Sequence, residues 1–337
     1  MQEKQPRPTS FDVARRAGVS QSAVSLVFGG KAEGRVGKRT QEAILQAARE
    51  LGYHPNRAAR TLRSGRSRIV ALVVPDVSNP YFAAVLQGAE EAARTSGYSV
   101  LLAQLHEEQD WQHVVLDALT SRAVDGFLFC TLQPPSESIA QVLQGKAIIV
   151  DETYQGLPSL QLDVEAGMQA AMEHLIHLGH RRIAHLGAAV DATSFHQRHH
   201  AYQAALQQAG LSFPADYLAR AAFTSADASR AAHQLLTCPE PPSAIVCDSD
   251  VLAVGVYKAA RALHRSIPRD LSVVSFDDSI IASMLDPELT TVAIPARTIG
   301  AQALALLLQA LEEGTAPASL TIPLTLMIRA STAQPAG

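Results

Sequence analysis

The sequence predicts a small all-α head followed by an α/β body of two doubly wound lobes. Residues 1–68 contain short amphipathic helical stretches bounded by caps and glycines. From Ile69 onward, short runs of β-branched and other apolar residues alternate with Ala- and Leu-rich helical stretches, and this series occurs twice. A chain of 337 residues has room for two or three domains, and 47% hydrophobic with 18% charged residues is typical of a soluble globular protein.

The charges are divided unevenly between these parts. Residues 1–68 hold 14 Lys and Arg against 5 Asp and Glu, whereas the remainder holds 14 against 27. The head is therefore basic and the body acidic. A basic head can neutralise the phosphates of a nucleic acid, whereas the same phosphates would repel the acidic body. The alternative is a soluble basic domain without a nucleic-acid partner.

Two short helices begin the head. Thr9, followed three residues later by Asp12, forms a capping-box pattern, so we expect a helix to begin there. Gly18 allows a tight turn, and Ser20 caps a second helix over Gln21–Phe28. The residues expected on the inner faces of these two helices are Phe11, Val13, Ala14, Ala17, Ala23, Val24 and Val27.

A third helix is expected over about Lys38–Leu51, ended by Gly52, and three helices can close a small core. Its expected inner residues are Ile44, Leu45, Ala48 and Leu51. Gly29–Arg35, before it, is a loop rich in glycine and cations, suited to lying along phosphates. Two helices about a glycine turn are the helix-turn-helix pattern, in which the second helix enters the major groove of DNA. The alternative is a helical hairpin with a solvated polar face.

Four side chains on the second helix are candidates for reading bases. Gln21 can bond adenine with both amide groups, Ser22 and Ser25 can donate or accept, and Leu26 can contact a thymine methyl.

The body shows two series of strands and helices. The strands of the first are expected at Ile69–Val74, Ser99–Ala103, Gly126–Cys130 and Ala147–Val150. The second series is expected as helix Val164–Leu178, strand Arg182–Leu186, helix Arg198–Ala209, strand Ala244–Cys247, helix Asp250–Leu263 and strand Leu271–Phe276. Two such sheets leave a cleft at the carboxyl ends of their strands, where ligands bind in α/β proteins.

Several motifs, in order along the chain, resemble the LacI/GalR (lactose-repressor) family of transcriptional regulators. Those of the head are A-G-V-S-Q-S-A-V-S at 17–25, R-V-G-K-R-T-Q at 35–41 and L-G-Y-H-P-N-R-A-A-R-T-L at 51–62. Those of the body are V-S-N-P-Y-F at 77–82, V-D-G at 124–126, L-G-H-R-R-I-A at 178–184, S-D-V-L-A-V-G at 249–255, F-D-D at 276–278 and L-T-T-V at 289–292. The resemblance implies a sequence-specific repressor controlled by a small-molecule effector, with a body like a periplasmic sugar-binding protein.

The resemblance also implies a hinge helix at about Asn56–Ser64, which forms on operator DNA and pairs with its copy in a dimer. Leu62 would be the wedge in the minor groove, with Ala59 near the groove floor. The candidate DNA-binding residues are Thr9, Ser20, Gln21, Ser22, Ser25, Leu26, Arg35, Asn56, Arg57, Ala59, Arg60, Leu62 and Arg63. Without the resemblance, 56–64 would be taken for a flexible Arg/Ser linker. Many family members have Arg where Leu26 stands, so the base preference should differ there.

The family's effector-binding residues correspond here to Tyr81, Phe82, Arg198, Phe223, Asp250 and Asp277. This set suits a sugar or sugar derivative, because Asp277 can accept hydroxyl hydrogens, Arg198 can donate to oxygens and aromatic rings can stack on an apolar sugar face. The family commonly has Asn where this chain has Ser249.

The expected domains are a helix-turn-helix domain at 1–54, a hinge and linker at 55–67, and an effector-binding and dimerisation domain at 68–337. Its N-lobe would comprise about 68–163 and 294–322, and its C-lobe about 164–293 and 323–331. We expect a homodimer on a pseudo-palindromic operator in double-stranded DNA, because twofold protein symmetry implies twofold symmetry of the site. Ser331–Gly337 is polar and has no heptad, so no tetramer-forming coiled coil is expected.

Enzyme and metal functions have little support in the sequence. The turn at Pro75–Phe82 lacks the G-x-G-x-x-G of nicotinamide enzymes, and no G-x-S-x-G elbow of a serine hydrolase exists. The residues weighed as metal ligands, His174, His177, His180, His196, His199 and His200, do not form one converging set, and we expect no cofactor. Cys130, Cys238 and Cys247 are expected to be small apolar residues without disulfides.

The chain shows no secretion signal in the polar stretch 1–9 and no membrane span, so we expect a cytoplasmic protein. The main alternative is a sensor of the periplasmic-binding-protein type that binds sugar in the cytoplasm without operator specificity. The basic head argues against it.

Overall fold

The computed structural model describes residues 8–53, 65–104, 111–130, 135–154, 156–315 and 317–336. The chain folds as two compact units, 1–67 and 68–337. The first contains three helices and the second two sheets of mainly parallel strands, which confirms the predicted fold class.

The head consists of α1 (Ser10–Ala17), α2 (Gln21–Phe28) and α3 (Lys38–Leu51). The capping box of α1 is present, since the backbone N–H of Thr9 donates to Oδ2 of Asp12 at 2.9 Å and the backbone N–H of Asp12 donates to Oγ1 of Thr9 at 3.4 Å. Gly18 ends α1 at φ 65°, a left-handed conformation that glycine adopts without strain. The hydroxyl of Ser20 caps α2 by accepting from the backbone N–H of Ala23 at 3.2 Å.

The core of the head forms around Val13, Val24 and Ile44, all 1% exposed or less. Two predicted core positions are wrong, because Phe11 is 65% exposed and Leu45 is 42% exposed. Residues two apart on a helix point in nearly opposite directions, so Phe11 cannot share the face of Val13. On α3 the buried stripe runs through positions 44, 47, 48 and 51, and Leu45 lies beside it.

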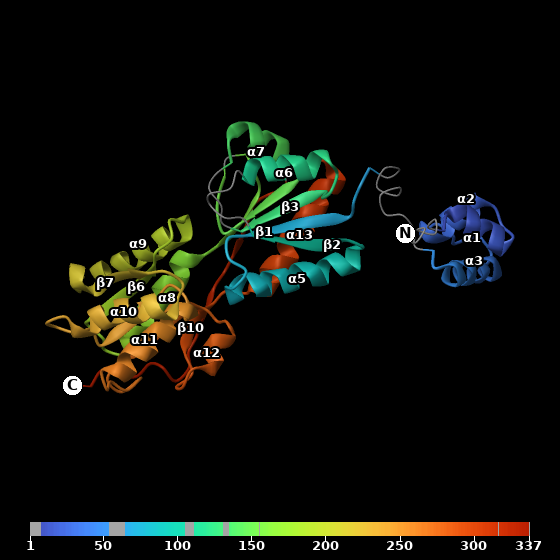
Figure 1. Cartoon of the computed structure of the whole chain (residues 1–337). Coiled ribbons are helices and arrows are strands. Elements are labelled where there is room, and N and C mark those ends of the chain that lie inside the picture. Colours follow the sequence, from blue (N-terminus) through green and yellow to red (C-terminus); the bar gives the residue numbers. More distant parts are fainter. Residues whose placement is uncertain are drawn as a thin grey trace, which may run out of the picture. The chain divides into compact units, whose positions relative to one another are not determined.

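Each lobe of the body contains one six-stranded sheet (Figure 1). The N-lobe sheet is parallel throughout and has the order β11-β5-β4-β3-β1-β2. Its strands are β1 (Ile69–Val74), β2 (Ser99–Gln104), β3 (Gly126–Cys130), β4 (Ala147–Val150), β5 (Ser159–Leu162) and β11 (Leu320–Ile322).

The C-lobe sheet has the order β12-β10-β9-β8-β6-β7, and only its edge strand β12 is antiparallel among the described strands. Its strands are β6 (Ile183–Ala188), β7 (Leu218–Ala221), β8 (Ala244–Cys247), β9 (Ser272–Asp277), β10 (Thr290–Ala293) and β12 (Thr325–Met327).

Helices cover both faces of each sheet, which is why the central strands are almost continuously apolar. In the N-lobe, α5 (Pro80–Ser96) and α13 (Ala296–Glu313) pack on one face, and α6 (Trp111–Thr120) and α7 (Glu137–Leu143) on the other.

In the C-lobe, α10 (Ser225–Thr237) and α11 (Asp250–Ala262) face α8 (Val164–His177) and α9 (Thr193–Gln208) across the sheet. Short helices η1 (Ala215–Tyr217) and α12 (Ile280–Met284) complete the lobe. Helix α9 begins five residues before the predicted start at Arg198. His196, which precedes the predicted start, therefore lies on this helix together with His199 and His200.

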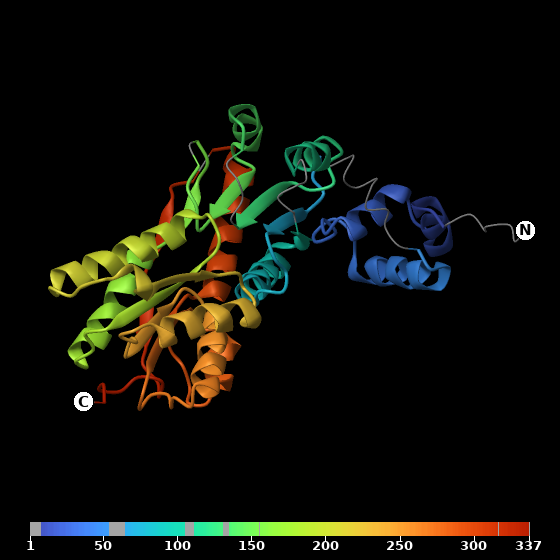
Figure 2. The same ribbon diagram turned by 60° about the vertical axis from the view of Figure 1, so that its left-hand side comes forward.

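The chain passes between the lobes after β5, after β10 and after β11 (Figure 2). The lobes thus share three connections and lie in the same compact unit. In the described part of the chain, we find no helix with the length and hydropathy needed to span a bilayer.

Candidate functional site

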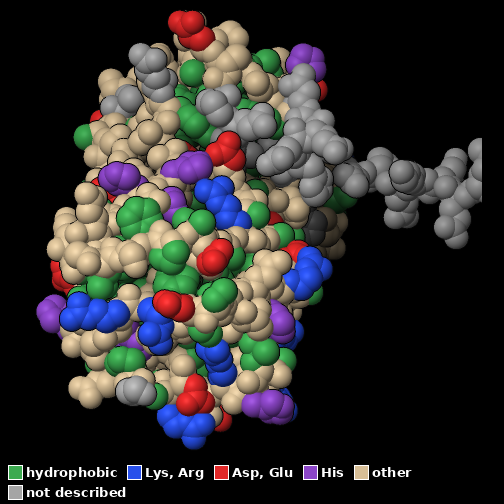
Figure 3. Space-filling model, turned by 90° about the vertical axis from the view of Figure 1, so that its left-hand side faces the viewer, with side chains coloured by type: hydrophobic (Ala, Val, Ile, Leu, Met, Phe, Trp, Pro, Cys, Tyr) green, Lys and Arg blue, Asp and Glu red, His purple; other side chains and the backbone are tan. Residues whose placement is uncertain are grey.

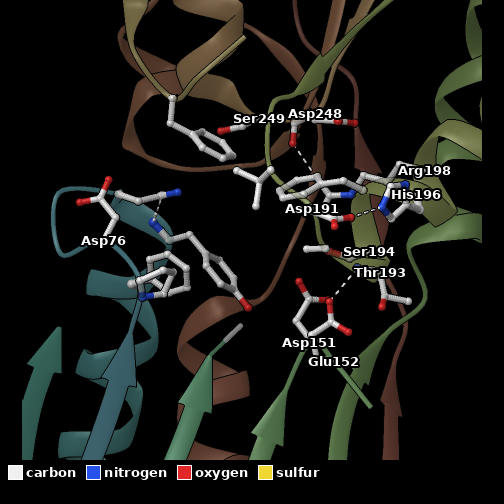
Figure 4. A pocket seen from close by; sticks show the side chains of 18 of the residues that line it. Asp76, Asp151, Glu152, Asp191, Thr193, Ser194, His196, Arg198, Asp248 and Ser249 are labelled. Carbon is white, nitrogen blue, oxygen red and sulfur yellow. Dashed lines mark hydrogen bonds and ion pairs between the residues drawn. The ribbon is translucent and has the colours of Figure 1, made fainter. Parts of the chain in front are cut away.

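A cavity of about 590 Å³ opens between the lobes, at the carboxyl ends of strands from both sheets (Figure 4). In each sheet the first strand lies between the second and third, so β1 and β6 mark the points where the strand order reverses. Loops that leave neighbouring strands diverge at such points, which creates a crevice for a ligand. Most of the lining residues lie at or just beyond the carboxyl ends of β1, β4, β6, β8 and β9, so the strand order determines where the cavity forms.

Aromatic side chains form much of the cavity wall. Asn79 caps α5 by accepting from the backbone N–H of Tyr81 at 3.0 Å, and this turn brings Tyr81 and Phe82 to the cavity, with ring centroids 5.1 Å apart. Phe195 and Phe223 pair on the C-lobe side at 5.9 Å. These rings offer apolar surface to a sugar ring or similar flat face.

Arg198 lines the cavity, and its side chain is almost completely buried, with only 3% exposed. Its Nη1 donates to the backbone carbonyl of Asp248 at 2.6 Å, and the guanidinium lies 4.4 Å from the ring centroid of Phe276. Among the described residues, neither its Nε nor the buried hydroxyl of Tyr81 has a hydrogen-bond partner. Buried donors are nearly always paired, so these two atoms are available to a ligand oxygen.

Two carboxylates face the same cavity. Asp277 ends β9, accepts from the hydroxyl of Ser249 at 2.6 Å, and has its pKa raised to about 8, first by burial and then by the negative charge of Asp250. Burial likewise raises the pKa of Asp151 to about 6, while Arg198 and a hydrogen bond from Ser194 act in the opposite direction. Ser249, at the position where the resemblance implied Asn, thus positions Asp277.

Asp250 is the one predicted effector-binding residue that does not line the cavity. It is completely buried and accepts hydrogen bonds from Ser275, from the hydroxyl of Thr291 at 2.9 Å, and from the backbone N–H and hydroxyl of Ser279 at 2.7 and 2.9 Å. Asp250 therefore fixes the position of the loop after β9 through hydrogen bonds to Ser279, without reaching the cavity itself. The other five, Tyr81, Phe82, Arg198, Phe223 and Asp277, all line the cavity.

Several lining residues were missed by the sequence prediction. Asp151 and Glu152 directly follow strand β4, so the rule that ligands bind at carboxyl strand ends could have found them. Trp111 and Tyr154 also line the cavity, and no local pattern distinguishes them from core aromatics.

In the head, Gln21 and Ser22 are exposed at the start of α2, and Arg35 is exposed in the following loop. Gln21 donates to the hydroxyl of Ser10 at 3.2 Å. Ser25 and Leu26 are half-buried. The hydroxyls of Thr9 and Ser20 are occupied as helix caps, as described above. The predicted hinge residues Asn56, Arg57, Ala59, Arg60, Leu62 and Arg63 lie outside the described residues.

Among the described residues, no cluster of three or more His, Cys, Asp and Glu could hold a metal ion. His180 is buried, with hydrogen bonds to Ser243 at 2.9 Å, Ser272 at 3.0 Å and the carbonyl of Ala333 at 2.9 Å. It ties the C-terminal segment to the C-lobe. All three cysteines are free.

Acidic and basic side chains are interspersed on the face of the body shown in Figure 3, without a large field of one sign. In the head, by contrast, exposed cations include Arg15, Lys31, Arg35, Lys38 and Arg39. The head is therefore the part suited to a polyanion.

Comparisons with known proteins agree with both units. Residues 11–56 match the family described as bacterial regulatory proteins, lacI family, and residues 172–332 match a periplasmic binding protein-like domain. The HTH-type transcriptional repressor CytR of Escherichia coli K12 is 31% identical over 329 residues, which cover 96% of each chain.

Two solved structures extend this likeness. The transcriptional regulator CelR in complex with cellobiose is 29% identical, with a TM-score of 0.71 over 96% of this chain and all of that one. The Lac repressor dimer bound to operator is 24% identical, with a TM-score of 0.85 over 97% of this chain and all of that one, and it shows the shared fold. The relatives are DNA-binding regulators and not enzymes. The similarity to CytR extends over nearly the whole of both proteins, and the chain belongs to the lacI family of bacterial regulatory proteins.

Proposed function

We propose that this protein is a cytoplasmic transcriptional repressor whose hold on its operator is controlled by a sugar or sugar derivative bound between the lobes. Residues 1–54 would read DNA, 55–67 would form the hinge, and 68–337 would bind effector and dimerise. A homodimer would place two heads on a pseudo-palindromic site.

The observation that supports the effector site most strongly is a pair of buried donors, Tyr81 Oη and Arg198 Nε, which have no hydrogen-bond partner in the described part of the chain. Both belong to residues that line a cavity with aromatic walls and the carboxylate of Asp277. A polyol presents hydroxyl oxygens for the two donors, hydroxyl hydrogens for the carboxylate and an apolar ring face for the aromatics. The similarity to a regulator solved with cellobiose supports the same class of ligand.

The head supports the DNA-binding role. Gln21 and Ser22 lie exposed in the first turn of α2, where a helix-turn-helix presents its base-reading side chains, and other residues of the head are exposed cations. Leu62, the predicted wedge, would enter the minor groove, so that specific binding to the operator would depend on the hinge. An effector that closes the two lobes would change how the hinges of the two protomers meet. The coupling free energy between effector binding and operator binding would be about 1 to 3 kcal/mol.

The test is a titration of labelled operator, first selected from random duplexes, with and without a panel of sugars, polyols and nucleosides. An effector should change the apparent Kd by about 5- to 150-fold, the range equivalent to that coupling. Asp277→Ala should remove the response and leave operator affinity intact, whereas the control Asp216→Ala, at an exposed position, should keep both. A full response in Asp277→Ala would exclude Asp277 from the effector site.

A further inference from the structure

Glu152 connects the two lobes at the rim of the cavity. It follows β4 of the N-lobe, and its Oε1 accepts from the backbone N–H of Thr193 in α9 of the C-lobe at 2.7 Å. The residue is only 8% exposed. Figure 4 shows Asp151 and Glu152 facing Thr193 and Ser194 at this point.

Helix α9 has no cap of its own. Its N-cap residue, Ala192, has no side chain that could accept from the free N–H groups of the first turn. The N-terminus of a 16-residue helix carries partial positive charge and unsatisfied donors, which attract ligand anions. This N-terminus opens into the cavity, since Ala192, Thr193 and Ser194 line it. Glu152 therefore occupies the position where a phosphate or carboxylate of a ligand would otherwise bind.

The remaining charges of the cavity are also unfavourable to an anion. Among the described lining residues, Arg198 is the only Lys or Arg, and it already donates to the carbonyl of Asp248. The acidic lining residues besides Glu152 are Asp76, Asp151, Asp191, Asp248 and Asp277. Asp277, with its raised pKa, is largely uncharged at neutral pH, but an anionic ligand would still be desolvated beside the other carboxylates. Among the described lining residues only Arg198 and the imidazole of His196 could carry a compensating positive charge.

We infer that Glu152 is a specificity-determining residue, which stands in for a ligand anion at the N-terminus of α9 and thereby restricts the cleft to effectors without a negative charge. This inference rests on the proposed function of the cleft and narrows its ligand class. Uncharged or cationic sugars enter, whereas their phosphate esters and carboxylic acids are rejected. The buried donors Tyr81 Oη and Arg198 Nε then serve neutral hydroxyl oxygens.

The test measures anion binding to the full chain without DNA. Wild type, Glu152→Ala and the control Glu90→Gln, on the exposed side of α5, are titrated with inorganic phosphate and with glucose 6-phosphate. Thermal unfolding midpoints are compared with those in sodium chloride of equal ionic strength. Removing one negative charge and freeing the backbone N–H of Thr193 should strengthen phosphate binding at least about tenfold in Glu152→Ala and leave the control unchanged.

Glu152→Gln covers the case in which Glu152→Ala does not fold, because the amide oxygen can still accept from Thr193 while the charge is gone. It should show a smaller gain for glucose 6-phosphate. The inference is overturned if neither variant gains affinity for the anions, or if wild type binds glucose 6-phosphate as tightly as it binds any neutral sugar. Failure of the proposed function is a separate result, namely that no ligand of any charge alters operator binding.

Discussion

Asp277→Asn should stabilise the protein while removing its best acceptor for a ligand hydroxyl. The carboxyl of Asp277 is buried at the cavity wall beside Asp250, and its pKa is raised from 3.8 to about 8. Because the folded protein binds this proton more tightly than the unfolded chain, the stability that the group contributes is complete below about pH 4. It is lost as the pH rises through about 8.

The size of the effect follows from this difference. Each pH unit between the two pKa values corresponds to about 1.4 kcal/mol, so the whole interval would correspond to about 6 kcal/mol. Because the cavity is open to solvent, part of this free energy is screened, and we expect the free energy of unfolding to fall by on the order of 3 kcal/mol between pH 5 and pH 8. Asparagine has no charge to desolvate and can still accept from Ser249, so Asp277→Asn should escape this loss.

The assay is thermal or urea unfolding of wild type and Asp277→Asn without ligand at pH 5 and pH 8. The stabilisation by Asp277→Asn should be larger at pH 8, by roughly 5 °C in the unfolding midpoint of the body. Asp216→Asn, at an exposed position, serves as the control and should show no such pH dependence. An equal effect of Asp277→Asn at both pH values would refute the reasoning that the folded site disfavours the charged carboxylate.

Three further predictions concern packing, a buried network and the hinge. Gly88→Ala should lower the free energy of unfolding by about 3 kcal/mol or more, since a Cβ on α5 would lie 1.8 Å from the carbonyl oxygen of Arg297 on α13; an unchanged urea midpoint would contradict this close approach. Asp250→Ala should lower the free energy of unfolding by about 3 to 5 kcal/mol because it leaves buried donors without an acceptor, and Asp250→Asn should lower it less. Equal unfolding midpoints for the two variants would argue against the network. Leu62→Ala should weaken operator binding by at least tenfold more than binding to random duplex at fixed salt, and equal losses would reject the wedge.

Local patterns in the sequence were sufficient for the three helices of the head and for the central strands of the body, whereas strands β5, β7, β10, β11 and β12 were not predicted. Caps and glycines have short-range causes, so Thr9, Gly18 and Ser20 could be assigned directly from their neighbours. The buried face of a helix is harder to assign when the helix is short and has apolar residues on several sides. This is why Phe11 and Leu45 were placed in the core although they are exposed.

The cavity shows a different limit of sequence reasoning. Ser249 and Asp250 are adjacent at the start of α11, and only the tertiary structure separates their roles, with one turned to Asp277 and the other to the loop at Ser279. The contact of Glu152 with Thr193 joins two lobes across 41 residues, and no periodicity or motif encodes it. Contacts of this kind follow from how two sheets pack, which local residue patterns do not specify.

The measurement that tests the central claim most directly is the selection of random DNA duplexes by the full-length protein at moderate ionic strength, with and without the sugar panel. The account predicts enrichment of one inverted repeat, with an occupancy that changes when a neutral sugar is added. If the selected duplexes were as varied as the starting pool under every condition, the protein would bind DNA only through charge, and the account of a ligand-controlled operator-binding protein would be contradicted.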